Sequence, residues 1–327
     1  MSKKNPLKIL LPLALIGAAA FLAINYRDNI MTFASDTIAN LTYTPPAEVA
    51  ALADKLNLTD EGRKIFYASR PQIETQDEFN KNCESHDAEV STLGCYSGGK
   101  IHIYNITDPE LNGIQELTAA HELMHAVWAR AGDENRAKLS DEISKVFNET
   151  DRHSDLVSEL ESYAEDETTD ELHSRLATEL ADLPDSLETH YAQYFKDQDA
   201  VVAFYDSYQG PFKKLDAEFE ALASEIEALK SEIDSLQTSY ESGAEEYSKE
   251  VEEFNRCAET VNCFTESEFN SRRAELVEKQ DMLEETYEKL SSAIDEYNSK
   301  IDHYNSNILR RRTLDAKVNS NKEIEDI

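Results

Sequence analysis

Two histidines and a glutamate, spaced His-Glu-x-x-His, are the residues of this chain best suited to chemistry: His121, Glu122 and His125. Side chains four residues apart on a helix lie one above the other, so both imidazoles would project from one face, as two nitrogen ligands of a tetrahedral Zn²⁺ must. Glu122 would lie about 100° around the helix. There its carboxylate could take a proton from water at the metal and pass it to a leaving amine. The spacing predicts a zinc site with Glu122 as catalytic base.

The motif needs a helix, and its flanks predict one. Leucine, alanine and valine dominate residues 117–129, and Gly132 offers a stop. Just before it, residues 100–106 alternate in polarity, which predicts a strand. In zinc peptidases an exposed edge strand beside the metal commonly binds an extended substrate as a further strand. His102, within this strand, is expected at the surface rather than at the metal.

A third metal ligand is expected in the acidic, helical stretch 132–184, where glutamate is too common for position alone to single one out. Met-turn zinc peptidases extend the motif with a glycine and a histidine, and Trp128 and Ala131 here exclude that class. The chain instead resembles the gluzincins, whose third ligand is a glutamate on a later helix, often followed three residues on by serine or alanine. This resemblance implies Glu171, with Ser174 as the small residue.

Other residues near Glu171 leave alternatives open. Glu179 is the second candidate for the third ligand, and His173 the third. Asp170 stands where gluzincins frequently have asparagine, and Arg175 where an acid often orients a ligand histidine. The groups that orient the ligands therefore cannot be assigned by the resemblance.

The segment from Glu171 to Val202 adds a second likeness. With the short N-terminal apolar segment, the HExxH motif and a following coiled coil, it resembles uncharacterised membrane-anchored proteins of candidate-phylum bacteria, a likeness that implies no established activity. His190, Tyr191 and Tyr194 are candidate oxyanion stabilisers, because an imidazole or phenol can polarise a carbonyl. Aromatic core residues are the alternative interpretation of all three.

The 327 residues carry a formal net charge of −34, and 40% are hydrophobic. So large an acidic excess argues against a nucleic-acid partner, because phosphates would be repelled. It argues equally against an anionic membrane as a partner of the soluble part.

The N-terminus combines basic and apolar residues. Lys3, Lys4 and Lys8 precede an apolar run over residues 9–24. Such a run is short for a hydrocarbon core of ~30 Å but can form a single span, and the preceding basic residues predict an extracytoplasmic position for the rest of the chain. An uncleaved signal anchor is favoured, and a cleaved signal peptide is the alternative because residues 18–20 are all alanine.

Four cysteines fall into two close pairs, Cys83 with Cys95 and Cys257 with Cys263. The chain has no C-x-x-C sequence, which argues against a cysteine zinc site. In an exported protein each pair predicts a local disulfide.

Two heptad-like seams occupy the C-terminal third. Their similar lengths and the short Cys257–Cys263 link between them predict an antiparallel coiled-coil hairpin rather than pairing between chains. The apolar positions of the first seam are Phe212, Leu215, Phe219, Leu222, Ile226, Leu229, Ile233, Leu236 and Tyr240, and those of the second are Leu276, Leu283, Tyr287, Leu290, Ile294, Tyr297, Ile301, Tyr304 and Ile308.

The predicted fold class is mainly α with a small β-sheet, a zincin-like α+β domain followed by an antiparallel α-helical coiled-coil hairpin. The predicted segments are a signal anchor (1–26), a juxtamembrane linker (27–46), a zincin-like metallopeptidase domain (47–210), the hairpin (211–310) and a flexible tail (311–327).

These features predict a membrane-tethered, extracytoplasmic zinc metallopeptidase with one Zn²⁺ per chain, held by His121, His125 and, by the gluzincin resemblance, Glu171. The expected partners are a protein or peptide substrate, the membrane through the N-terminal helix, and a protein on the coiled coil. The alternative is a structural envelope protein whose coiled coil is the working part and whose zincin domain is inactive.

Overall fold

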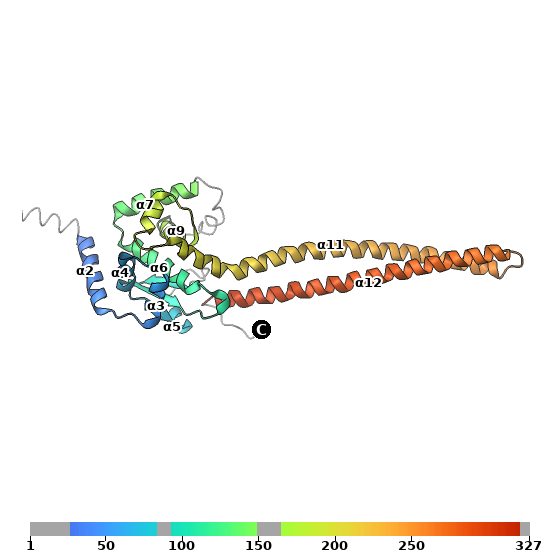
Figure 1. Cartoon of the computed structure of the whole chain (residues 1–327), viewed down its shortest axis with the longest axis horizontal. Helices are drawn as coiled ribbons and strands as arrows, with labels where there is room; N and C mark the ends of the chain where they lie inside the picture. The colour runs from blue at the N-terminus through green and yellow to red at the C-terminus, as the bar shows by residue number, and fades with distance from the viewer. Residues whose placement is uncertain (1–26, 84–92, 149–164, 321–327) are drawn as a thin grey trace, which may run out of the picture. The chain divides into compact units, whose positions relative to one another are not determined.

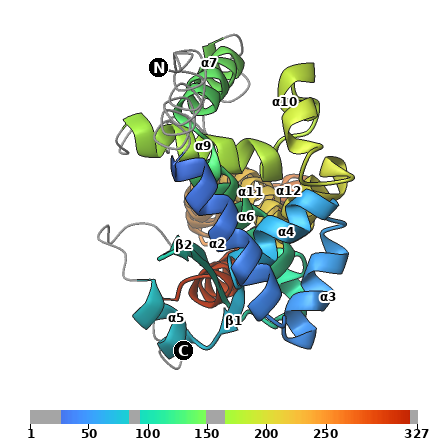
Figure 2. The same ribbon diagram turned by 90° about the vertical axis from the view of Figure 1, so that its left-hand side faces the viewer.

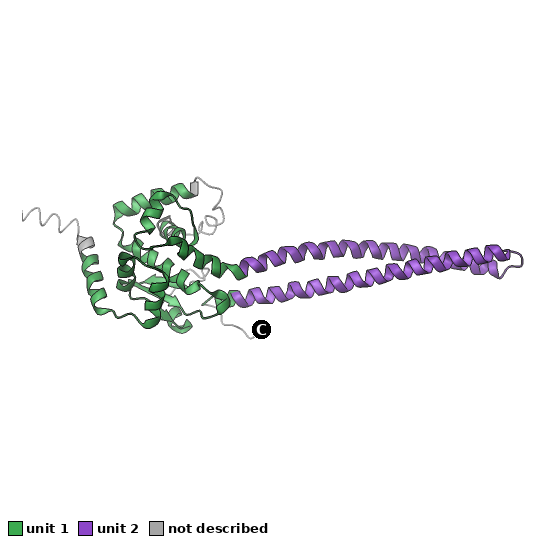
Figure 3. Cartoon of the chain, in the orientation of Figure 1, with its two compact units in different colours: residues 1–211, 315–327 green, residues 212–314 purple. Residues whose placement is uncertain are grey.

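The computed structural model describes residues 27–83, 93–148 and 165–320. The predicted anchor, residues 1–26, lies outside this part of the chain. The described residues are mainly helical, with one small three-stranded sheet and a long C-terminal helical pair, which confirms the coarse fold class. The chain divides into two compact units, unit 1 (Met1–Pro211 with Asp315–Ile327) and unit 2 (Phe212–Leu314), which Figure 3 shows in different colours.

Unit 1 contains the helix with the HExxH motif at its centre. This helix, α6, packs against α9 on one side, against strands of the sheet on another, and also against α3 and α4. The helices of unit 1 are α2 (Arg27–Thr42), α3 (Ala47–Lys55), α4 (Asp60–Ala68), α5 (Gln76–Asn82), α6 (Ile114–Arg130), α7 (Asp133–Asn148), α9 (Glu165–Glu179), α10 (Asp185–Tyr191) and the first turns of α11 (Gln198–Ala258), with a short 3-10 helix at Pro109–Leu111.

Local sequence explains where two of these helices begin. Thr59 caps α4, because its side chain accepts a hydrogen bond from the Gly62 amide. Gly113 precedes α6 with a φ of 94°, a conformation that costs glycine little. A Cβ at this position would lie 2.7 Å from the Phe204 carbonyl oxygen, so the start of α6 can approach α11 only with glycine here.

The sheet covers one side of α6. Its strands are β1 (Gln72–Glu74), β2 (Gly94–Ser97) and β3 (Lys100–Tyr104), in the order β1-β3-β2. Central β3 pairs with β1 in parallel and with β2 in antiparallel fashion. Ile101 and Ile103 point from β3 into the core. The predicted strand 100–106 is therefore present as Lys100–Tyr104, but it is the central strand of the sheet and not the exposed edge strand that we expected beside the metal.

Both predicted disulfides are present. Cys83–Cys95 joins the end of α5 to β2, and Cys257–Cys263 closes the link between the two long helices. No free cysteine occurs among the described residues.

Residues 27–42, predicted as linker, form helix α2, which packs on α4 (Figures 1 and 2).

The described part of the predicted flexible tail, residues 311–320, is helical as far as Lys317 and makes polar contacts. The Gln76 and Asn80 amides both donate to the Ser320 carbonyl oxygen, and Lys317 pairs with Asp108. These polar contacts hold residues 315–320 on unit 1, and only residues 321–327 of the tail lie outside the description. No described helix is both long enough and apolar enough to cross a membrane.

Unit 2 consists of α11 from Phe212 onward and of α12 (Glu266–Lys317) as far as Leu314, and these two helices run antiparallel. Phe219 contacts Tyr304, whereas Tyr240 contacts Tyr287, so residue numbers rise on one helix as they fall on the other. The two apolar seams thus cover each other, except that Tyr287 and Ile294 of the second seam are 56% and 40% exposed. Asn307 is buried and donates to Glu218, and a polar pair of this kind favours one register over others. Helix α11 begins at Gln198, earlier than the predicted hairpin.

Because its two seams cover each other, the isolated segment Phe212–Leu314 is expected to be a helical monomer. Circular dichroism should show a helical spectrum, and sedimentation equilibrium should give the mass of one chain at all loading concentrations. A dimer that persists on dilution would show that the seams prefer another chain.

Candidate metal centre

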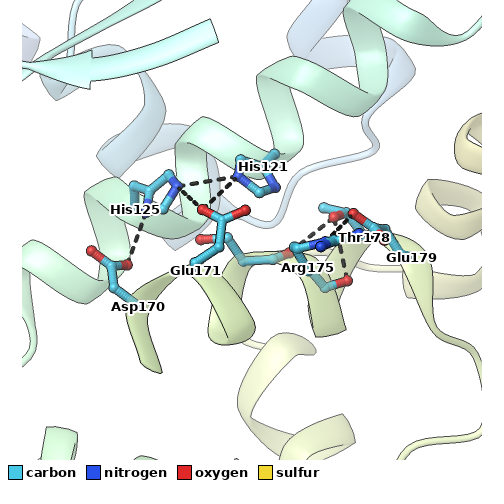
Figure 4. Close-up of polar contacts among 8 residues, drawn as sticks. His121, His125, Asp170, Glu171, Arg175, Thr178 and Glu179 are labelled. Carbon is cyan, nitrogen blue, oxygen red and sulfur yellow. Dashed lines mark hydrogen bonds and ion pairs between the residues drawn. The ribbon is translucent and has the colours of Figure 1, made fainter. Parts of the chain in front are cut away.

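Helices α6 and α9 bring His121, His125 and Glu171 together (Figure 4). The two Nε2 atoms lie 3.1 Å apart. Glu171 Oε2 lies 3.5 Å from the Nε2 of His121 and 3.4 Å from that of His125. Three atoms able to bind a metal therefore converge on one point from two helices that are far apart in the sequence.

The spacing of these three atoms matches one face of a metal-centred tetrahedron. Bonds of ~2.0–2.1 Å at tetrahedral angles place two ligand atoms roughly 3.3 Å apart. The three observed distances are 3.1, 3.4 and 3.5 Å. His121, Glu122 and His125 also form a group whose potential ligand atoms all lie within 4.8 Å of one another. The donor set of two imidazoles and one carboxylate fits Zn²⁺.

Asp170 orients one of the imidazoles. Its Oδ1 lies 2.9 Å from Nδ1 of His125, which can donate a hydrogen bond to it. With the proton held on Nδ1, the lone pair of Nε2 points toward His121 and Glu171. The gluzincin resemblance left the orienting group unassigned, and Asp170 is in place for that role, directly before Glu171 in the sequence.

Burial and neighbouring charges shift the pKa values of this cluster. Burial opposes ionisation of Glu171, but His121 and His125 hold the pKa of its carboxyl group well below the usual value. Burial also opposes protonation of His125, but hydrogen bonds to Asp170 and Glu171 raise its pKa well above the ordinary value. The cluster thus attracts positive charge, and a metal ion competes with the proton for the same nitrogen.

Glu122 lies beneath the edge strand β2. It is 4% exposed, and its Oε2 has no hydrogen-bond partner in the described part of the chain. Burial raises the pKa of its carboxyl group, although His125 and His121 act in the opposite direction. A Cβ at Gly94 would lie 2.7 Å from Oε1 and Cγ of Glu122 and 2.5 Å from a methyl carbon of Thr118. Only a glycine lets β2 pass this close to the carboxylate.

No family model, no curated protein and no solved structure matches the chain. Any functional inference therefore depends on the contacts of these side chains.

The two other candidates for third ligand lie elsewhere. Glu179 forms an ion pair with Arg175 on its own helix, at 2.9 Å, and Figure 4 shows it directed away from the histidine pair. His173 is fully buried, and its Nε2 lies 2.9 Å from Nε2 of His190. Neither contacts His121 or His125 through a hydrogen bond or ion pair in the described part of the chain.

The suggested oxyanion stabilisers also lie away from the cluster. Tyr191 is fully buried and donates to the backbone oxygen of His173, so it is a core residue. His190 and Tyr194 line a cavity of about 530 Å³ formed with residues of α2, α4, α6 and α7, and none of the clustered ligand atoms lines it. Burial lowers the pKa of His190 to about 4, so its imidazole is neutral at pH 7.

The expectation that His102 lies at the surface was wrong. It is 5% exposed, and its Nδ1 lies 2.8 Å from Glu74 Oε1. Helix α5 packs over this side of β3, so both faces of the strand are covered. Nothing in the sequence indicated that Gly94 lies against Glu122, apart from its position next to Cys95. Alternation within one strand could reveal neither this contact nor the one between His102 and Glu74.

Gly94→Ala is expected to destabilise unit 1, because the new methyl group would collide with Glu122 and Thr118. Overpacking of this kind costs about 1–3 kcal/mol, measurable as the free energy of urea unfolding. Gly132→Ala is the matched control, because a Cβ there meets nothing within 4 Å. Equal unfolding free energies for the two variants would contradict the close approach of β2 to Glu122.

Proposed function

We propose that unit 1 is a gluzincin-like zinc peptidase domain with a zincin-like α+β fold, held at the membrane on its extracytoplasmic side by the N-terminal segment. The observation that carries this proposal is the convergence of His121 Nε2, His125 Nε2 and Glu171 Oε2 at tetrahedral spacing. Glu122 Oε2, which is buried and has no hydrogen-bond partner among the described residues, supports it further. The two disulfides agree with an oxidising compartment.

Each residue has a distinct role in this proposal. His121, His125 and Glu171 would hold Zn²⁺, and Asp170 would keep His125 in the tautomer that leaves Nε2 available. The ion, when bound, supplies a Lewis acid that makes water nucleophilic near neutral pH and polarises a carbonyl group.

Glu122 would move the proton. Its carboxylate accepts a proton from the attacking water as the new C–O bond forms, and delivers it to the amine nitrogen as the C–N bond breaks. The water oxygen ends in the new carboxyl group, and the other product is an amine. Burial of Glu122 suits this role, because a raised pKa makes its carboxylate a stronger base.

In this proposal the peptide substrate pairs with the free edge of strand β2. The Tyr104 amide donates to the Leu93 carbonyl oxygen, so pairs 93–104 and 95–102 are the hydrogen-bonded ones. The backbone polar groups of Gly94 and Tyr96 then point away from β3. In the described part of the chain β2 has no strand on that side, and an extended peptide could pair there directly above Glu122.

Glu122→Gln is expected to keep zinc and lose peptide cleavage, because this residue handles only the proton. Loss of a general base costs about 10²–10⁴-fold in rate. His121→Ala, His125→Ala and Glu171→Ala should lose both zinc and cleavage. Elemental analysis gives zinc per chain, and digestion of a peptide library with and without a chelator gives activity.

Glu179→Gln is the control on the same helix and should keep both zinc and cleavage, because Glu179 contacts Arg175 instead. Full zinc occupancy in all the histidine and Glu171 variants would place any metal elsewhere. Zinc binding without chelator-sensitive cleavage would favour the alternative in which unit 1 is inactive and the helical pair is the working part.

Asp170→Ala is expected to weaken zinc binding by about 10–100-fold, because His125 loses the group that fixes its ring. Asp170→Asn should lose less, since the amide oxygen can still accept from Nδ1. Competition with a fluorescent zinc chelator measures the affinity. If Asp170→Ala binds zinc as tightly as Glu179→Gln, Asp170 has no orienting role.

A further inference from the structure

The exposed large apolar side chains of unit 1 are concentrated on one helix. Met31 and Phe33 are each 65% exposed, Ile38 is 60% exposed and Leu41 is 81% exposed. All four lie on α2, and the other exposed large apolar residues of the described chain lie in unit 2. Water is an unfavourable neighbour for so much apolar surface on a single helix, and such surfaces mark interaction sites.

Three of these exposed residues, Met31, Ile38 and Leu41, lie on one face of α2. Ala34 lies on the same face, because residues 31, 34, 38 and 41 follow one another at intervals of three or four. Phe33 lies to the flank, with the Lys64 ammonium group 5.6 Å from its ring centre. We name Met31, Ala34, Ile38 and Leu41 the outer face of α2.

The opposite side of α2 is the one that packs on unit 1. Asp36 and Ala39 are buried there. Asp36 accepts two hydrogen bonds of 2.9 Å from Arg130 at the end of α6, and Asn40 donates to the Lys64 backbone oxygen. The described residues of unit 1 therefore leave the outer face exposed.

The helix segment that carries the outer face is almost free of charge. Residues 29–42 contain a single ionisable side chain, Asp36, which Arg130 neutralises, in a chain where 30% of residues are charged. The hydroxyl groups of Thr37 and Thr42 donate to backbone oxygens of their own helix. The four side chains of the outer face carry neither a charge nor a hydroxyl group, as contact with an apolar medium requires.

The sequence before α2 indicates which medium this is. The apolar run of residues 9–24 ends seven residues before Met31. A chain of seven residues spans at most about 25 Å, so a bilayer that holds residues 9–24 lies within reach of the outer face.

We propose that α2 is an interfacial helix whose outer face docks on a zwitterionic lipid bilayer. This inference rests on the anchor in the proposed function but not on the peptidase chemistry. An anionic surface is disfavoured because the net charge of −34 would be repelled. Docking would also hold the C-terminal end of α6 near the bilayer, through the pair between Asp36 and Arg130.

The test uses the full chain in phosphatidylcholine vesicles, with tryptophan as the reporter. The chain has one tryptophan, Trp128, which is 9% exposed and gives the background signal. Leu41→Trp and Ile38→Trp place a reporter on the outer face, and Glu188→Trp places the control at an exposed position of α10. Flotation of the vesicles reports the anchor separately from the docking of α2.

Phosphatidylcholine brominated on its acyl chains should quench more than about half of the added fluorescence of Leu41→Trp and Ile38→Trp, because an interfacial helix buries its apolar face ~5–10 Å deep. Glu188→Trp should stay unquenched by lipid and open to acrylamide. These fluorescence results do not depend on zinc binding or peptide cleavage. They therefore test the docking of α2 even if the proposed peptidase chemistry is wrong.

Three outcomes would overturn the proposal. The outer-face reporters could behave as Glu188→Trp does, in vesicles that carry the chain, which would leave the face in water. They could be hidden from both acrylamide and brominated lipid, which would show that a second copy or residues 9–24 cover the face. The chain could also fail to float with the vesicles, in which case no lipid contact holds α2.

Discussion

Three charged or ionisable side chains of α6 pair with residues of other helices, and these pairs tie three other elements of unit 1 to α6. A buried charge without a partner costs several kcal/mol, so each contact fixes the position of a helix relative to α6. The pairs are Glu116 with Lys55 of α3, His125 with Asp170 of α9, and Arg130 with Asp36 of α2. The same set of pairs brings Glu171 to the histidines, because Asp170 and Glu171 are adjacent on α9.

Sequence alone predicted the features whose cause is local. The interval from His121 to His125 is set by one helix, and the seams of unit 2 by two helices with regular periodicity. Elements whose cause is tertiary were missed. Strand β1 has three residues and exists only because it pairs with β3, and α2 has one buried charge whose partner, Arg130, lies 94 residues away. Periodicity carries no information about such contacts.

The candidate site divides in the same way. His121, Glu122 and His125 follow from a spacing, but Glu171 came from a resemblance, because 66 acidic residues leave no positional signal. His102 shows the opposite error. Alternation correctly placed it across the strand from Ile101 and Ile103, but a polar residue on that side is exposed only if nothing covers it. Helix α5 covers it, and Glu74 satisfies its ring.

An unpaired buried atom does not by itself identify a site. Besides Glu122 Oε2, three buried polar side-chain atoms have no hydrogen-bond partner among the described residues, namely Glu74 Oε2, His173 Nδ1 and Ser174 Oγ. Each costs about 1–3 kcal/mol of stability if left unsatisfied. The other oxygen of Glu74 contacts His102 and Asn82, and no further imidazole among the described residues is hydrogen-bonded to this carboxylate. Glu122 differs because two imidazole nitrogens and the Glu171 carboxylate converge beside it. It is this combination, a buried carboxylate next to three converging donor atoms, that makes Glu122 the residue to which the proposed function assigns proton transfer.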